Sequence, residues 1–166
     1  MKIFYKIIIL LFVMSSILPG MKPVNASTKI ENLLSEGYKT KSAVNQIPKL
    51  TDIFQVSTNQ ILVTFDRRVE IDLGTKASTY WIQSLSDTIP TGIASLGRNS
   101  RLNANNALST NQVSITKVQG DNNSFLLTFK QEIPSNKRFK LVVRNLNVPG
   151  GMPFSGDNGT KIFIGK

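Results

Sequence analysis

Short runs of alternating apolar and polar residues follow one another from residue 49 to the end of this 166-residue chain. The clearest runs cover residues 60–65 and 124–130. Every second residue in them is large and apolar: Ile61, Val63, Phe65, Phe125, Leu127 and Phe129. A period of two is typical of a β-strand that buries one face. The two runs can therefore supply facing layers of one sheet-built core.

Turn-forming residues separate eight such segments, as expected of an all-β domain. The predicted strands are residues 50–56, 60–65, 79–83, 91–96, 112–118, 124–130, 139–145 and 161–165. We predict a β-sandwich of about seven to eight mostly antiparallel strands, with residues 49–166 forming one domain. Asp121-Asn122-Asn123 and Asp157-Asn158-Gly159 are predicted to form Asx-type turns.

Alternation also predicts which side chains point into the core. Phe139, Leu141 and Val143 share one face of their strand, and a slip of one residue would bury cations instead. In the last strand we expect Ile162 and Ile164 to point inward and Phe163 outward. The parity of the strand over 112–118 breaks at Lys117-Val118, which indicates either a bulge or a strand end.

The first 26 residues have the pattern of a secretory signal peptide. Lys2 and Lys6 precede an apolar segment over residues 7–18, and Val24-Asn25-Ala26 offers a cleavage site before Ser27. An uncleaved amino-terminal anchor is the alternative. Residues 27–48 lack periodicity apart from one short helical pattern, so they are interpreted as a polar leader.

Composition restricts the chemistry of the chain. It contains no cysteine and no histidine, which removes disulfides, the usual zinc sites and histidine-dependent triads. Cleavage of the signal leaves 17 basic and 10 acidic residues, a net charge of +7 that favours anionic partners. The cations are scattered, so no specific nucleic-acid binding is predicted.

Several residues match a family pattern. Asn59 to Phe65 form an extended run ending in Thr-Phe, with Asp66 next and Val69 four residues after the phenylalanine. This resembles the bacterial Ig-like domains of S-layer and other cell-surface proteins. The segments 124–129 and 139–143 are similar to a late hairpin of that family. Residues 146–153 keep its glycines but lack its acidic residue. The resemblance implies an Ig-like β-sandwich.

Three residues are candidates for ligand binding. Trp81 and Tyr80 adjoin on one predicted strand, so their rings point to opposite faces, and an exposed ring could stack on a sugar. The long polar connection over residues 97–111 carries Arg98 and Arg101, which could contact phosphate or carboxylate groups. The core is the alternative location for Trp81, and an unoccupied loop is the alternative for the arginines.

Catalytic and metal sites are not predicted, and neither is a cofactor. Asp66, Glu70 and Asp72 lie close together, but Arg67 and Arg68 between them would neutralise a calcium site. Ser114 and Lys117 have the spacing of a serine-lysine hydrolase but would lie on opposite faces of a strand.

The sequence therefore predicts a secreted, non-catalytic Ig-like module, extracellular or loosely associated with the bacterial cell surface. Its expected partner is an anionic cell-wall polymer, a glycan or a surface protein, without stable membrane insertion after signal cleavage. A carbohydrate-binding module and a structural domain of a surface assembly are the alternatives, and the sequence leaves the oligomeric state open.

Overall fold

The computed structural model describes residues 47–166, so the expected signal peptide and nearly all of the leader lie outside the described residues. Seven strands make up this part of the chain: β1 (Leu50–Ser57), β2 (Gln60–Phe65), β3 (Tyr80–Ser84), β4 (Val113–Lys117), β5 (Ser124–Phe129), β6 (Arg138–Arg144) and β7 (Asp157–Ile164). Three single-turn helices lie between strands: α3 (Ile71–Gly74), η2 (Ala77–Thr79) and η3 (Ala104–Asn106).

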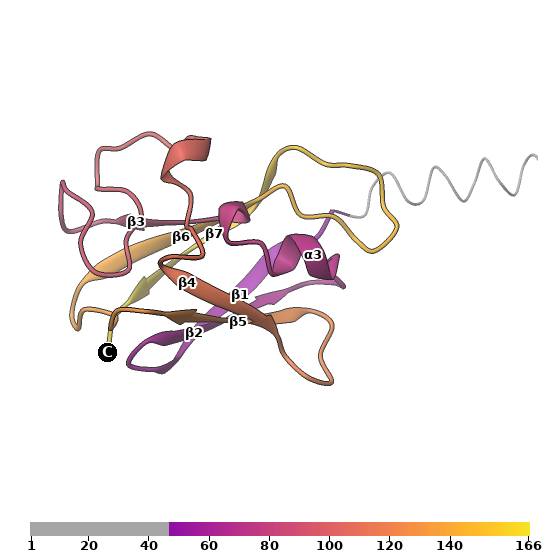
Figure 1. Cartoon of the computed structure of the whole chain (residues 1–166), viewed down its shortest axis with the longest axis horizontal. Helices are drawn as coiled ribbons and strands as arrows, with labels where there is room; N and C mark the ends of the chain where they lie inside the picture. The colour runs from indigo at the N-terminus through magenta and orange to yellow at the C-terminus, as the bar shows by residue number, and fades with distance from the viewer. Residues whose placement is uncertain (1–46) are drawn as a thin grey trace, which may run out of the picture. The chain divides into compact units, whose positions relative to one another are not determined.

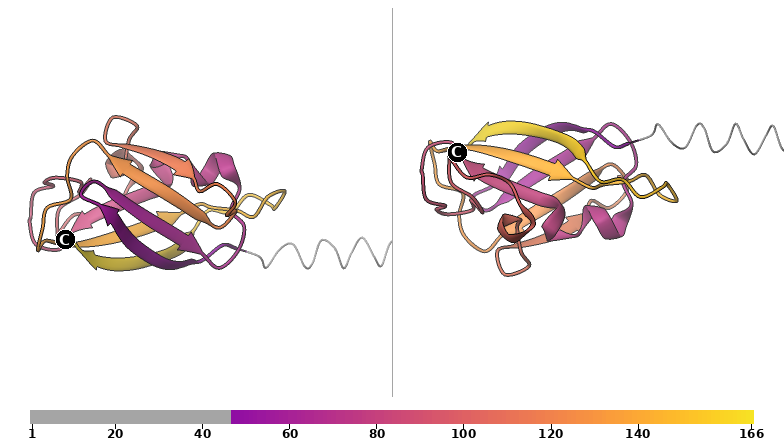
Figure 2. Two further views of the ribbon diagram at one scale, coloured as in Figure 1. Left: turned by 90° about the horizontal axis from the view of Figure 1, so that it is seen from below. Right: turned by 90° about the horizontal axis from the view of Figure 1, so that it is seen from above.

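The strands form two antiparallel sheets (Figures 1 and 2). One sheet has the order β1-β2-β5-β4 and the other has the order β3-β6-β7. Numbered along the chain, this is the strand order of an immunoglobulin constant-type sandwich, in which four strands face three. The predicted all-β sandwich is thus confirmed, with seven strands.

The core lies between the two sheets and is built as the alternation predicts. Ile61, Val63 and Phe65 of β2 are buried, as are Phe139, Leu141 and Val143 of β6 and the predicted face of β5. Phe65 and Phe125 meet edge to face, with ring centroids 6.2 Å apart. Edge-to-face contact is a favoured arrangement of aromatic pairs, so the two central strands are locked together by ring geometry as well as by burial.

The prediction for the inward face of the last strand is wrong. Phe163 is the residue of β7 that packs on the core, with its ring centroid 5.5 Å from that of Phe139. Ile162 and Ile164 are 54% and 53% exposed. Both alternate sets on this strand contain large apolar residues, so parity alone could not choose between them. The register Phe139↔Phe163 decides the orientation.

Residues 91–96, a predicted strand, form none. Their contact with a sheet is a single parallel bridge between Gln83 and Leu96, and the Ile82 carbonyl accepts from Ser95 N–H at 2.8 Å and Leu96 N–H at 3.2 Å. Gly92 adopts φ 57°, a left-handed conformation that interrupts extended backbone. The segment therefore closes the free edge of β3 as a loop. The break in alternation at Lys117-Val118 is a strand end and not a bulge, because β4 ends at Lys117.

Both predicted Asx turns are present, and one of them contains a buried residue that the turn motif did not reveal. Asn123 N–H donates to Asp121 Oδ1 at 2.7 Å, and Gly159 N–H donates to Asp157 Oδ1 at 2.8 Å. Asn158 lies between Asp157 and Gly159 in the second turn, and its side chain is 0% exposed. It joins the start of β1 to the connection between β6 and β7 through Pro48 and Leu146.

The hydroxyl of Tyr80 is sealed inside the sandwich, where it donates to the Gly74 carbonyl at 2.6 Å. Burial raises the pKa of Tyr80 well above its ordinary value of about 10. Since the unfolded chain ionises this hydroxyl first, Tyr80 contributes stability below about pH 10 and loses that contribution as pH rises further.

We therefore expect Tyr80→Phe to be about 1 kcal/mol less stable than the parent at pH 7, because the hydrogen bond is lost. Above about pH 10.5 the order of stability should reverse. Ionisation of Tyr80 then stabilises the unfolded state of the parent, and Tyr80→Phe has no such group at this position. Urea unfolding of both proteins between pH 7 and 11.5 measures this. Parallel stability profiles would show that Tyr80 titrates in the folded state.

Candidate functional site

The polar connection over residues 97–111 folds onto the outer face of the β3-β6-β7 sheet. Trp81 is the main anchor: its Nε1–H donates to the Asn103 carbonyl at 2.9 Å, and its ring packs against Leu96 and Val142. Leu102 and Ala107 from the connection pack against the same small cluster. A second apolar core thus lies outside the sandwich and holds the connection in place.

Gln83, two residues further along β3, is a second anchor that the sequence did not reveal. It is 5% exposed, and its amide nitrogen donates to the carbonyls of Gly97 (3.2 Å), Arg98 (2.9 Å) and Ser100 (3.3 Å). Its Oε1 has no partner among residues 47–166. A glutamine on the outward parity of a strand would ordinarily be assigned to solvent, so no sequence signal separates it from a surface residue.

Asparagine side chains shape the tip of the connection. Asn103 caps η3, since its Oδ1 accepts from Asn105 N–H at 2.9 Å while its own N–H donates to Asn106 Oδ1 at 3.0 Å. Asn106 Nδ2 also donates to the Arg101 carbonyl at 2.8 Å. These bonds are the reciprocal capping arrangement of a helix start. The backbone that carries the two candidate arginines is thus fixed at several points.

Four cations lie on the 97–111 connection or on the outer face of the sheet beside it: Arg98, Arg101, Lys140 and Arg144. We call this set the cationic face. Arg98 and Arg101 are exposed, and the outward parity of β6 carries Lys140, opposite Gln83, and Arg144. Residues 47–166 contain 14 basic and 8 acidic residues but form only two ion pairs, Arg67–Asp66 and Lys137–Asp87. None of the four cations forms an ion pair with another residue of 47–166, so they are available to an anion.

Both candidate aromatic rings are buried in the structure. Trp81 is 5% exposed and Tyr80 is 0% exposed, because the loop covers one and the sandwich covers the other. A cavity of about 260 Å³ lies beside Trp81, with Asn103 and Arg144 in its lining. The structure thus brings the candidate Trp81 beneath the loop that carries Arg98 and Arg101. Ligand binding by these three residues stays a prediction.

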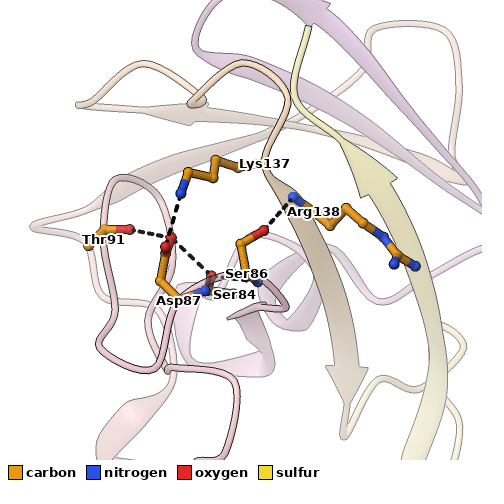
Figure 3. A network of polar contacts seen from close by, with 6 residues as sticks. All are labelled: Ser84, Ser86, Asp87, Thr91, Lys137 and Arg138. Carbon is orange, nitrogen blue, oxygen red and sulfur yellow. Dashed lines mark hydrogen bonds and ion pairs between the residues drawn. The ribbon is translucent and has the colours of Figure 1, made fainter.

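Figure 3 shows a polar network that fixes the segment after β3 to the start of β6. The Asp87 carboxylate accepts from Lys137 Nζ at 3.0 Å and from Thr91 Oγ1 at 3.0 Å. Arg138 N–H donates to Ser86 Oγ at 3.2 Å. The hydrogen bond from Lys137 holds the pKa of Asp87 below its usual range. This carboxylate is occupied by structural contacts, so it is not free to act as a general base.

The acidic residues after β2 are arranged in a similar way. Asp66 accepts from Arg67 at 2.7 Å and from the N–H of Lys49 at 2.8 Å. Arg67 lowers the pKa of Asp66, as expected for a carboxylate held in an ion pair. No group of three residues suited to hold a metal ion occurs within 47–166. Ser114 and Lys117 lie three residues apart on β4, so their side chains point to opposite faces of the strand.

No family model matches the chain, and no curated protein matches it. Comparison with solved structures finds fragments of bacterial S-layer protein SbsC at 12–13% identity. The S-layer protein rSbsC(31-844) gives a TM-score of 0.49, with 80% of this chain and 16% of that chain covered. The N-terminal part of SbsC gives 0.46 (86% and 30%), and SbsC domains 1-6 give 0.48 (86% and 17%). The chain thus spans less than a third of each of these proteins.

Within residues 47–166, no helix has the length and apolar content that a membrane crossing needs.

Proposed function

We propose that this chain is an exported, non-catalytic Ig-like module that binds an anionic polymer at the outside of a bacterial cell. The observation that carries the proposal is the cationic face: two of its four basic side chains lie on a loop held by Trp81 and Gln83, two lie on β6, and none forms an ion pair within residues 47–166. A braced surface binds with a smaller loss of conformational entropy than a mobile loop would. The signal peptide expected over residues 1–26 supplies the export step.

Binding without catalysis is supported by the way the titratable groups are used. The chain lacks histidine and cysteine, and Asp66 and Asp87, two of the carboxylates with a lowered pKa, are each held by a neighbouring cation. Their lowered pKa values therefore have a structural cause. A polymer of repeated phosphate or carboxylate groups needs only spaced cations, and the two exposed arginines provide a forked geometry suited to such groups.

The test is retention of the secreted protein on purified cell walls, with and without extraction of their anionic polymers. Arg98→Ser/Arg101→Ser should weaken retention about fivefold to tenfold and flatten its dependence on salt, because two exposed charge contacts are lost. Extraction of the anionic polymers should have the same effect on the parent protein.

The matched control is Arg68→Ser/Lys76→Ser, which removes the same charge from two exposed residues between β2 and β3. It should reduce retention by less than twofold. Equal loss in both double variants would mean that net charge alone binds the wall, and unchanged retention in the arginine variant would refute the proposed site.

A structural role in a surface assembly is the second candidate function. It is favoured by the outer edge of β4, which ends the four-stranded sheet without a neighbouring strand among residues 47–166. Open sheet edges are common sites of association between chains. Sedimentation at increasing protein concentration tests it, since assembly through this edge should raise the apparent mass.

A further inference from the structure

Four large apolar side chains are grouped on the outer edges of β1 and β7. Phe54 and Val56 are 58% and 51% exposed, and Ile162 and Ile164 are 54% and 53% exposed. β1 and β7 run side by side along one edge of the sandwich (Figure 2). We call these four residues the edge patch. Single exposed apolar residues are ordinary, whereas a contiguous group marks an interaction site.

The edge patch borders an open groove between the two strands. The groove has a volume of about 360 Å³, and Phe54, Ile162 and Ile164 line it. The two isoleucines point outward because Phe163 between them packs on Phe139. Burying the isoleucines by rotating the strand would expose Phe163, so the patch is built into the register of β7.

Two cations lie beside the edge patch. Arg138 and Lys166 are the charged residues that line the groove, and no acidic residue lines it. Lys166 Nζ lies 5.2 Å from the centroid of the Phe54 ring, and Arg138 is opposite Ile164 in the β6-β7 register. Neither cation forms an ion pair with residues 47–166. The surface therefore joins apolar side chains to two cationic side chains, with no acidic side chain in the groove.

An added β-strand does not fit this groove well. One end is closed by Lys49 Nζ donating to the Asp157 carbonyl at 2.8 Å. The other end is closed by Gln55, which accepts from Lys166 N–H at 2.9 Å. Ile53 N–H, on the same stretch of β1, already donates to Asp52 Oδ1 at 2.7 Å. Ladder pairing with a foreign strand would have to break these contacts.

A second copy of the chain fits poorly for an electrostatic reason. It would bring another Arg138 and another Lys166 to the same contact, and like charges at an interface oppose association. A surface with negative charge above an apolar layer satisfies both features of the patch at once. An anionic phospholipid surface has that composition, with phosphates at the level of the cations and acyl chains below.

We propose that the edge patch docks this protein peripherally on an anionic phospholipid surface. Phe54, Ile162 and Ile164 enter the boundary between headgroups and acyl chains, while Arg138 and Lys166 contact phosphates. This site adjoins the cationic face, since Lys140 is opposite Ile162 in the β6-β7 register, but it uses Arg138 and Lys166 in place of Arg98 and Arg101 and does not depend on polymer binding. Docking of this kind is reversible, because it buries a few side chains and spans nothing.

The first test uses vesicles of phosphatidylglycerol mixed with phosphatidylcholine, and vesicles of phosphatidylcholine alone. Because the chain has no cysteine, Ile164→Cys gives a single attachment point for an environment-sensitive dye. Anionic vesicles should shift the dye emission to the blue, and high salt should weaken the effect. The control label at Thr116→Cys, an exposed residue of β4, should show no shift. Equal shifts at both positions would overturn the proposed orientation, and no shift at Ile164 would overturn the proposal.

The second test measures vesicle co-sedimentation of charge-matched variants. Arg138→Ser/Lys166→Ser should weaken binding about 25-fold, since each cation near an anionic surface contributes about fivefold. The control Arg98→Ser/Arg101→Ser removes the same charge on the cationic face and should weaken vesicle binding less than twofold. Comparable losses in the two variants would refute a specific docking face.

The apolar part is tested with Phe54→Ser and Ile162→Ser, two exposed positions where far-ultraviolet circular dichroism should confirm retained folding. Each should reduce binding to anionic vesicles by about tenfold or more. Retention of these variants on extracted walls should be unchanged, so that failure of the membrane proposal differs from failure of the polymer proposal. If the parent instead ignores vesicles but self-associates, and Phe54→Ser abolishes the association, the patch serves a second copy and the membrane proposal is wrong.

Discussion

Replacing Asn158 by leucine is expected to lower the free energy of unfolding by about 3 to 5 kcal/mol. The Asn158 side chain is 0% exposed and makes three hydrogen bonds to backbone groups. Its Oδ1 accepts from Leu146 N–H at 2.8 Å, and its Nδ2 donates to the carbonyls of Pro48 and Leu146, each at 2.9 Å. Leucine would leave all three backbone groups buried without a partner, and each such group costs about 1 to 3 kcal/mol.

Asn158→Asp separates hydrogen bonding from packing, because aspartate has nearly the shape of asparagine. An ionised carboxylate keeps the bond to Leu146 N–H but faces two carbonyls that need donors. Protonation restores one donor, so the folded protein should raise the pKa of this carboxyl above its unfolded value of about 4. A raised pKa means that stability is present below about pH 4 and is lost as pH increases.

Urea unfolding between pH 3.5 and 7 measures this dependence. The control is Asn111→Asp, which adds the same charge at an exposed asparagine before β4. We expect the Asn158→Asp variant to lose stability steadily relative to that control as pH rises. Identical profiles would show that the Asn158 amide does not hold the two carbonyls in solution.

The alternation of apolar and polar residues predicted the sandwich because it is a local property of each strand, and strands of both sheets bury the residues that it assigns to the core. Each residue of the 60–65 and 124–129 strands that was expected inside is buried, since the partner strand of each was also patterned. The last strand shows the limit. Ile162, Phe163 and Ile164 satisfy either parity, and the choice depends on the contact with Phe139, 24 residues earlier in the sequence.

The strand predicted over residues 91–96 failed for a related reason. Ile93, Ala94 and Leu96 are buried, but they lie on a loop that bonds to Ile82: Ile93 and Ala94 join the between-sheet core, and Leu96 joins the Trp81 cluster. Apolar content therefore predicted burial correctly, while the backbone conformation was set by Gly92 and by the free edge of β3.

The candidate site was predictable in part. The length and polarity of the 97–111 connection singled out Arg98 and Arg101, but nothing in the sequence showed that Gln83 bonds to three carbonyls beneath them. Two alternatives were open for Trp81, exposed or in the core, and the structure places it in a separate cluster outside the sandwich. The Trp81 ring is on the outward-facing side of β3, and it is buried because the 97–111 connection crosses over it.

Trp81→Ala should therefore destabilise the protein by about 3 kcal/mol and act first on the loop. The substitution removes a ring that contacts Leu96 and Val142, together with the Nε1–H bond to the Asn103 carbonyl. Loss of a buried tryptophan costs about 3 to 5 kcal/mol in a well-packed core. The lower figure applies because the Trp81 cluster is small and the loop over it can shift into the space that the ring leaves. The between-sheet core around Phe125 does not contact the ring, so it should remain folded.

Amide hydrogen exchange distinguishes these outcomes. In Trp81→Ala, residues 97–108 should lose protection while β2, β5 and β6 keep theirs, which is the behaviour of a locally unfolding unit. Trp81→Phe keeps most of the packing without the N–H and should cost only about 1 kcal/mol. Unchanged protection over the loop would mean that Trp81 does not anchor it.

The same variants connect the anchor to binding. If Arg98 and Arg101 act from a braced backbone, loosening the loop should reduce wall retention in Trp81→Ala even where circular dichroism shows a folded sandwich. Trp81→Phe, which keeps the loop packed, should retain the parent's binding. Lost retention in both variants with full loop protection would instead indicate a direct contact between the indole and the ligand, and would favour the carbohydrate-binding alternative.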